Sequence, residues 1–276
     1  MILHKLSWVV SMLEINKIHQ GDCLILMKEI PDKSVNLILC DLPYGVTARN
    51  EWDVIIPFDK IWEQYVRIIK DDGCIVLTAI QPFASMVVMS NLKLFKYEWI
   101  WEKTQGTGFL NAKKQPLRNH EQVLVFYKSQ PTYNPQMWQS TPYTAKRLDK
   151  SYSTNYGKQT RVDTINTDGK RYPLTVQKFK YDSNKVHPTQ KPIELFEYII
   201  KTYTNEGDLV LDNCIGSGTT ALACLNLNRN FIGIELEQKY VDIGNQRIME
   251  VKSGCDANGD GIPPKDKSLG ILPNEL

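Results

Sequence analysis

Long apolar runs are absent from this sequence. No run approaches the roughly 20 residues that a transmembrane helix needs. The apolar segment from Leu6 to Leu13 is too short for a span and lacks the small-residue cleavage site of a signal peptide. We therefore expect a cytoplasmic protein with no membrane partner.

Metal-binding patterns are missing as well. The six cysteines form no C-x-x-C pair, and the four histidines form no H-x-x-x-H pair. Cysteines within or beside apolar runs are typical of reduced core thiols. We expect no zinc site or other metal site, and a metal-dependent hydrolase is a poor interpretation.

Charge, by contrast, is plentiful and unevenly distributed. Residues 101–191 hold 16 basic and 6 acidic residues, a net charge of +10, whereas the remainder holds 17 basic and 25 acidic residues, a net charge of −8. The same segment contains 12 of the 27 aromatic residues. Basic side chains interleaved with flat rings suit a phosphate backbone and unstacked bases. A solvated basic face is the alternative interpretation.

Strand and helix patterns alternate over residues 15–100. Residues 35–40 are almost wholly apolar, as in a strand buried on both faces. Apolar residues at helical spacing over 58–69 predict a helix, which Asp71-Asp72-Gly73 should end before a strand at 74–79. This rhythm predicts an α/β domain with a parallel sheet covered by helices.

The periodicity fades between residues 130 and 184 and then resumes. We expect a helix, a strand, a helix, a strand and a last helix at 192–203, 209–211, 219–227, 231–234 and 237–249. The sheet is therefore expected to be built from two blocks of sequence that a basic, irregular insertion separates.

A glycine-rich turn follows the strand expected at 209–211. It reads Asp212-Asn213-Cys214-Ile215-Gly216-Ser217-Gly218-Thr219, and glycines at such a position let the backbone approach a ligand at a helix N-terminus. Glu235, at the end of the next strand, could accept hydrogen bonds from ribose hydroxyls. The pattern also fits a NAD-dependent oxidoreductase, or a tight turn without a ligand.

An acidic turn, Asp41-Leu42-Pro43-Tyr44, follows the buried strand at 35–40. It lies at the carboxyl end of that strand, where parallel sheets place their ligands. The lone pair of an exocyclic base amine is delocalised into the ring, and hydrogen bonds to a carboxylate and a carbonyl would localise it. Asp41 and a neighbouring carbonyl could supply both acceptors, while Tyr44 stacks on the base. An ordinary Pro-containing turn is the alternative.

These turns, together with His187-Pro188-Thr189-Gln190-Lys191-Pro192, resemble the β-class amino-methyltransferases of DNA. That family has D-P-P-Y, then a target-recognition region, then H-P-T-x-K-P and a glycine-rich motif, and the resemblance spans about residues 15 to 250 in the same order. It implies a Rossmann-like, S-adenosylmethionine-dependent fold in circularly permuted order, with an inserted target-recognition region.

The resemblance also implies a role for each motif residue. Asp41 and the Leu42 carbonyl would accept the target amine, and Tyr44 would stack on the flipped base. Leu42 stands where the family usually has a proline, but a main-chain carbonyl can come from leucine. The expected catalytic residues are thus Asp41, Leu42, Pro43 and Tyr44. The expected cofactor contacts are Asp22 at the adenine, Glu235 at the ribose, Lys191 near the methionine carboxylate, Asp212 near its amino group, and Gly216, Ser217, Gly218 and Thr219 along the methionine part.

The activity implied is methyl transfer from S-adenosylmethionine to an exocyclic amine of a flipped base in double-stranded DNA. Asp41 at the first position of the turn favours N6 of adenine. N4 of cytosine, RNA or a protein amide remain alternatives, as does a non-catalytic DNA-binding protein. Methylation of cytosine C5 needs a cysteine nucleophile, usually after proline, and the sequence has no Pro-Cys pair. A second copy of the chain and a cognate restriction endonuclease are possible partners.

The expected organisation has five parts. They are an N-terminal extension (1–14), the catalytic half of the domain (15–129), the target-recognition insertion (130–184), the cofactor-binding half (185–252) and a flexible tail (253–276).

Overall fold

The computed structural model describes residues 12–45, 53–145, 152–153, 157–158, 163–182 and 190–253. The chain divides into two compact units. Unit 1 comprises residues 1–134 and 175–262, and unit 2 comprises residues 135–174 and 263–276. Of the motif expected at 187–192, His187, Pro188 and Thr189 lie outside the described residues, as do most of the expected extension and tail.

Unit 1 is built on an eight-stranded sheet with the order β1-β14-β13-β2-β3-β5-β4-β12. Its strands are β1 (Lys17–Gln20), β2 (Val35–Cys40), β3 (Ile69–Ala79), β4 (Phe95–Thr107), β5 (Arg118–Phe126), β12 (Val176–Phe179), β13 (Leu209–Asp212) and β14 (Asn230–Glu235). Within this sheet β5 alone runs opposite to its neighbours β3 and β4. The expected α/β fold with a parallel sheet covered by helices is confirmed for most of the sheet, and β5 is the exception among the described strands. A short hairpin joins β4 to β5, and antiparallel strands need no crossover helix.

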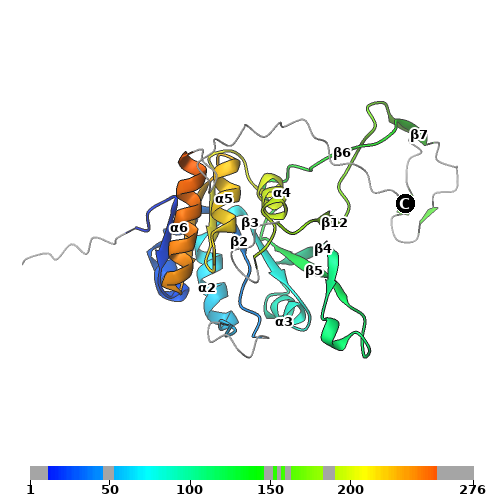
Figure 1. Ribbon diagram of the computed structural model, residues 1–276. Helices are drawn as coiled ribbons and strands as arrows, with labels where there is room; N and C mark the ends of the chain where they lie inside the picture. Colours follow the sequence, from blue (N-terminus) through cyan, green and yellow to red (C-terminus); the bar gives the residue numbers. More distant parts are fainter. Residues whose placement is uncertain are drawn as a thin grey trace, which may run out of the picture. The chain divides into compact units, whose positions relative to one another are not determined.

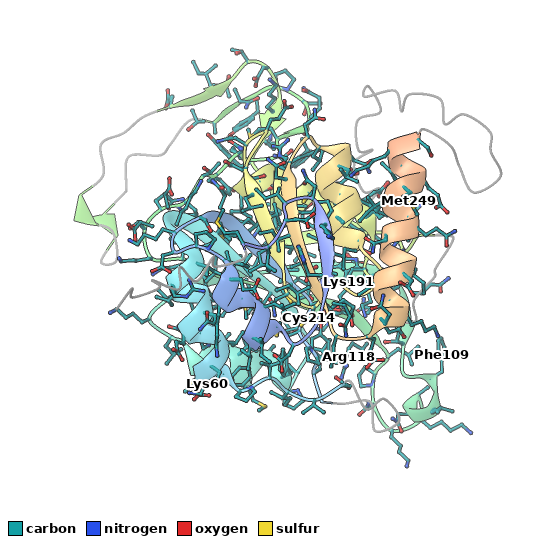
Figure 2. All side chains as sticks on the ribbon, turned by 90° about the vertical axis from the view of Figure 1, so that its left-hand side faces the viewer. Lys60, Phe109, Arg118, Lys191, Cys214 and Met249 are labelled. Carbon is teal, nitrogen blue, oxygen red and sulfur yellow. The ribbon has the colours of Figure 1, made fainter. Side chains whose placement is uncertain are left out.

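Helices cover both faces of the sheet (Figure 2). One face carries α1 (Cys23–Leu26), the 3-10 helix η1 (Met27–Glu29), α2 (Phe58–Ile68) and α3 (Phe83–Ser90); the other carries α4 (Ile193–Tyr203), α5 (Thr219–Asn226) and α6 (Gln238–Ser253). Alternate residues of β2 point to opposite sides. Leu37 and Leu39 pack in the core with α4, α5 and α6, and Ile38 and Cys40 pack in the core with α1, α2 and α3. This alternation explains why β2 is apolar along its whole length.

The two sequence blocks meet in the middle of the sheet. β2 pairs in parallel with β13, and Ile38 lies opposite Leu211. At the sheet edge, blue β1 lies beside orange α6, so the two ends of unit 1 pack together (Figure 1). The close approach depends on Gly244 of α6, because a Cβ there would lie 2.5 Å from Ile18 Cδ1.

One helix boundary differs from expectation. Helix α2 ends at Ile68, and β3 begins at Ile69, so Asp71, Asp72 and Gly73 lie inside a strand instead of ending a helix. The register of β3 against β2 shifts between Val35 and Leu37, and this irregularity accommodates the polar residues. A Cβ at Gly73 would lie 2.7 Å from Ile69 Cγ1, which explains the glycine.

Unit 2 is a series of nested antiparallel strand pairs. The pairs are β6 (Trp138–Gln139) with β11 (Lys170–Arg171), β7 (Tyr143–Ala145) with β10 (Thr164–Asn166), and β8 (Tyr152–Ser153) with β9 (Gly157–Lys158). The part of unit 2 that lies within the expected insertion covers fewer residues, 135–174 instead of 130–184. One reason is that Val176–Phe179 joins the main sheet beside β4. This strand has only four residues, too few for a clear pattern in the sequence.

Two features are absent from the part of the chain that the structure describes. No helix there combines the length and apolarity that a membrane crossing requires. In the same residues, no group of three or more histidine, cysteine, aspartate or glutamate side chains is arranged to hold a metal ion.

Candidate active site

The functional site lies at the carboxyl edge of the sheet in unit 1. The acidic turn follows β2 and the glycine turn follows β13, and these strands are parallel neighbours. β1 and β14 end together on the other side of β13, with Gln20 opposite Glu235. The end of β4 and the start of β5 reach the same edge, because the two strands are antiparallel. Loops far apart in the sequence are therefore brought together, as parallel sheets require.

These loops enclose a cavity of about 770 Å³. That volume lies within the range of roughly 300–1,000 Å³ that is usual for small-molecule sites. Eleven of the twelve expected site residues line it: Asp22, Asp41, Leu42, Pro43, Tyr44, Lys191, Asp212, Gly216, Ser217, Thr219 and Glu235. The acidic and glycine turns thus face one cleft, so a group could pass directly between them.

Gly218 is the exception, because it is not part of the cavity lining. Its φ is +88°, and a Cβ there would lie 3.2 Å from the Cα of Gly244 on α6. The structure therefore gives Gly218 a packing role at the start of α5. At Gly216, where φ is +53°, a Cβ would meet no atom within 4 Å. This glycine supplies the left-handed backbone conformation that the turn needs.

The carboxylate of Asp41 is held on both oxygens. Oδ1 accepts hydrogen bonds from the hydroxyls of Tyr44 and Thr78. Oδ2 lies 2.6 Å from the ammonium of Lys191. The Asp41 side chain is 23% exposed, so it remains open to the cavity while its position is fixed.

A chain of four alternating charges extends from Asp41. Lys191 Nζ also lies 3.3 Å from Glu121 Oε2, and Lys103 Nζ lies 2.5 Å from Glu121 Oε1. The side chains of Lys191, Glu121 and Lys103 are 10% exposed or less. Buried charges are tolerated only when they are paired, as these are.

Lys191 lines the cavity, and the structure pairs its ammonium with the acidic turn. Its expected place near the methionine carboxylate stays a prediction. Burial alone would lower the pKa of the Lys191 ammonium, yet the neighbouring charges of Asp41, Tyr44 and Glu121 raise it well above the usual lysine value. Lys191 thus remains a cation beside the Asp41 carboxylate.

The sequence interpretation also missed Glu121, Lys103 and Thr78. Each lies close to an apolar run within its strand: Thr78 follows residues 74–77 of β3, Lys103 follows residues 99–101 of β4 by two positions, and Glu121 precedes residues 123–126 of β5. A polar residue beside an apolar run was the available signal. It could not show which of these side chains share one network.

On the cofactor side, the Asp212 carboxylate is buried beneath the glycine turn. It accepts hydrogen bonds from the Cys214 backbone N–H at 3.1 Å and from the Thr220 hydroxyl. Burial raises the pKa of this carboxyl to about 7. Asp212 is thus an acceptor that lacks a cationic partner among the interactions of the described residues.

This raised pKa gives a prediction on stability. The unfolded chain releases the Asp212 proton near pH 3.9, and the folded chain releases it near pH 7. The folded state therefore binds more protons between these values, and the stability contribution of this group falls as pH rises through the window. Asp212→Asn should raise the melting temperature at pH 8 by roughly 2–8 °C, since 1 kcal/mol shifts it by about 2–4 °C.

Thermal melts of the ligand-free chain at pH 5 and pH 8 measure this effect. The gain should be small at pH 5, where Asp212 is already protonated in the wild-type chain. Asp242→Asn on exposed helix α6 is the matched control and should change neither melt. An equal gain at both pH values would contradict the prediction.

Glu235 and Asp22 are each engaged with the backbone. Glu235 Oε2 accepts a hydrogen bond from the Gly216 N–H at 2.8 Å, and Oε1 accepts one from the Glu237 N–H at 2.9 Å. Burial raises the pKa of the Glu235 carboxyl. Asp22 caps α1 by accepting from the Leu24 N–H at 2.7 Å. Both carboxylates are held in place at the cavity wall.

Arg247 of α6 was not expected at the site. Its Nη1 donates to the Ser217 carbonyl at 2.6 Å and lies 3.3 Å from Ser217 Oγ. The guanidinium thereby fixes the glycine turn from outside. Burial lowers the pKa of Arg247 from its ordinary value.

These residues fit S-adenosylmethionine. Its methionine ammonium needs an acceptor, which the buried Asp212 carboxylate could provide. Its ribose hydroxyls need an acceptor at the end of the neighbouring strand, where Glu235 lies beside the glycine turn. The cavity is large enough to hold the cofactor and also reach Asp41.

An α/β sheet with an acidic turn and a glycine turn facing one cavity defines a nucleoside-cofactor enzyme of the methyltransferase class. The chain belongs to the DNA methylase family of N6 and N4 methyltransferases, whose sequence profile matches residues 35–246. The family assignment confirms the resemblance, the Rossmann-like methyltransferase fold and S-adenosylmethionine as cofactor.

Curated relatives agree with this assignment. The chain is 31% identical over 255 residues to the type II methyltransferase M1.MboII of Moraxella bovis, covering 85% of this chain and 96% of that protein. It is 27% identical over 267 residues to the type II methyltransferase M.HpaI of Haemophilus parainfluenzae, covering 91% and 77%.

Solved structures have the same fold. The complex of M1.HpyAVI with S-adenosylmethionine aligns with a TM-score of 0.57 at 25% identity, covering 84% of this chain and 98% of that one. The cytosine-N4-specific PvuII DNA methyltransferase aligns with a TM-score of 0.60 at 17% identity, covering 91% and 95%. At 17% identity the likeness concerns the fold alone.

Proposed function

We propose that this chain methylates N6 of adenine in double-stranded DNA. The observation that carries the proposal is the shared cavity, in which the carboxylate of Asp41 faces the glycine turn from the neighbouring strand. An aspartate at the first position of the acidic turn favours adenine by resemblance to the family. The fold likeness to a cytosine-N4 enzyme does not bear on the choice of base.

S-adenosylmethionine, when bound, supplies an electrophilic methyl group. The chain has to hold the attacking amine in line with that group, and positioning alone accounts for a large part of such rate enhancements. Asp41 accepts one amine N–H, and the main-chain carbonyl of Leu42 accepts the other. Leu42 is itself buried, so its carbonyl belongs to a fixed segment of backbone.

The target amine has to replace a donor that Asp41 already has. Tyr44 and Thr78 share Oδ1, and Lys191 occupies Oδ2. Of the two donors to Oδ1, Tyr44 is the one that lies on the cavity wall, so rotation of its ring away from Asp41 opens Oδ1 to the amine and presents a face to the base. Lys191 stays in place on Oδ2.

We infer that unit 2 contacts the DNA around the target base. Its exposed aromatic residues include Tyr143 and Tyr172, which are 41% and 71% exposed. The guanidinium of Arg171 lies 4.3 Å from the centroid of the Tyr143 ring. Ring and cation pairs of this kind contact bases and phosphates. Pairing with a second copy of the chain or with a restriction endonuclease remains a prediction.

A product analysis tests the proposal. Unmethylated duplex DNA, RNA and a protein extract would each be incubated with the chain and labelled cofactor, then digested and separated by mass spectrometry. We expect N6-methyladenine from duplex DNA alone. N4-methylcytosine as the product would overturn the assignment to adenine, and label in RNA or protein would overturn the assignment to DNA. Sequencing of the methylated DNA gives the recognition sequence.

A further inference from the structure

An exposed apolar tip stands at the turn between β4 and β5. We call residues 108–117 the hairpin tip. It contains the 3-10 helix η2 (Phe109–Asn111), in which the side chain of Phe109 is 71% exposed and that of Leu110 is 100% exposed. Neighbouring large apolar side chains that are exposed to solvent often mark an interaction site.

The hairpin tip is also basic. From Thr104 to His120 the sequence has three basic residues, Lys113, Lys114 and Arg118, and no acidic residue. All three side chains are exposed, and in the part of the chain that the structure describes none of them forms an ion pair. The surface therefore has exposed apolar side chains beside positive charges that no carboxylate neutralises. This combination suits duplex DNA, whose phosphates are negative and whose stacked bases have apolar faces.

The tip joins directly onto the active-site cavity. Gln105, Gly106, Thr107 and Arg118, at the base of the hairpin, all line the cavity. Figure 2 shows Arg118 beside the site residues Lys191 and Cys214, with Phe109 farther out. Thr107 is paired with Arg118 across the hairpin, after a shift of register between Glu102 and Thr107, so the tip begins at the cavity rim.

The tip has internal support. The N–H groups of Lys114 and Gln115 both donate to the Asn111 carbonyl, at 2.8 and 3.0 Å. At its base, a Cβ on Gly106 would lie 2.8 Å from the Cβ of Leu117, so the two sides pack closely. Phe109 and Leu110 are therefore presented on a formed turn.

We propose that the hairpin tip is a wedge that enters the base stack of the DNA duplex next to the target base. Phe109 and Leu110 fill the space that the flipped base leaves, and Lys113, Lys114 and Arg118 contact the flanking phosphates. Apolar side chains that insert between base steps offset the cost of unstacking. This inference rests on the proposed function, because it requires duplex DNA as the substrate.

The double variant Phe109→Ala/Leu110→Ala tests the wedge. Methylation rate would be measured on the recognition duplex, and fluorescence on a matched duplex that carries 2-aminopurine at the target position. Unstacking costs a few kcal/mol, and 1.4 kcal/mol corresponds to a factor of ten. We expect kcat/KM to fall about 10- to 100-fold and the fluorescence rise on binding to be reduced. On a duplex with an abasic site opposite the target, which needs no unpairing, the variant should methylate within about threefold of wild type.

Met249→Ala is the matched control. Met249 is 63% exposed and lies near the far end of α6, away from the edge where the helix begins after β14. This variant should behave as the wild type on both duplexes. In addition, Lys113→Ala/Lys114→Ala should reduce the slope of log affinity against log salt by about 2, one for each phosphate contact.

Several results would overturn the wedge. Unchanged kcat/KM of the double variant, or a loss that the abasic duplex does not rescue, would reject it. Conversion of a wild-type dimer into a monomer, seen by light scattering, would assign the hairpin tip to a second copy instead. If the wild-type chain fails to methylate any duplex, the proposed function itself fails, whereas a wild type that methylates beside an unaffected variant rejects the wedge alone.

Discussion

Asp41→Ala is expected to lower the rate of methyl transfer about 10²- to 10⁴-fold, the usual range for a positioned acid or base. The substitution removes the acceptor that holds the target amine, and Leu42 alone cannot orient it. Affinity for S-adenosylmethionine, measured by calorimetry, should stay within a few-fold of wild type, because Asp212 and Glu235 belong to the other turn.

Asp59→Ala provides the comparison for this variant. Asp59 lies in the first turn of α2 and its side chain is 75% exposed. Loss of this carboxylate should leave both turnover and cofactor affinity unchanged. A wild-type rate for Asp41→Ala would show that the acidic turn does not hold the amine.

Lys191→Met is expected to destabilise the folded chain by about 3–5 kcal/mol, the usual cost of removing one partner from a buried ion pair. Asp41 and Glu121 would then face each other without the ammonium between them. Turnover should fall as well, because the two carboxylates would repel each other and Asp41 would lose the cation that fixes its position. Urea unfolding and initial rates measure the two effects.

A double variant separates the electrostatic cause from simple loss of packing. Lys191→Met/Asp41→Asn removes the carboxylate charge that loses its cation and keeps the buried Lys103–Glu121 pair, so it should recover part of the stability without recovering the wild-type rate. Lys17→Met serves as the surface control. Lys17 pairs with Glu14, both at least half exposed, and this change should cost within about 1 kcal/mol. Equal stability of Lys191→Met and wild type would contradict the role of the buried charges.

The central strands of the fold could be predicted from the sequence because their apolar runs are continuous. β2 has the bounds that the pattern predicted, and β13 and β14 differ by at most one residue at each end. β4 and β5 were not predicted. In β4, Trp99, Trp101 and Lys103 are buried, whereas the residues between them are partly exposed, because the strand lies near the sheet edge. Its sequence therefore lacks a continuous apolar run.

The candidate site was predictable at the level of turns but not of side-chain partners. Parallel strands bring their carboxyl ends to one edge, so the meeting of the two turns follows from the order of strands and helices. Which cation neutralises Asp41 does not follow, because Lys191 reaches it from the segment before α4, and Glu121 comes from a strand whose direction was not anticipated. The alternation of apolar and polar residues within a strand does not show whether the strand runs parallel or antiparallel to its neighbours.

The chain leaves unit 1 and returns to it at two fixed points. The Asn134 N–H donates to the Thr202 carbonyl at 2.8 Å, and the Thr175 carbonyl accepts from the Ile100 N–H at 2.8 Å. Everything between these anchors belongs to unit 2, and the residues of that stretch that the structure describes contribute no strand to the catalytic sheet. Given the DNA-contacting role that we propose for unit 2, substitutions, insertions or wholesale exchange of that stretch would alter the sequence preference of such an enzyme over evolutionary time without rebuilding the machinery that transfers the methyl group.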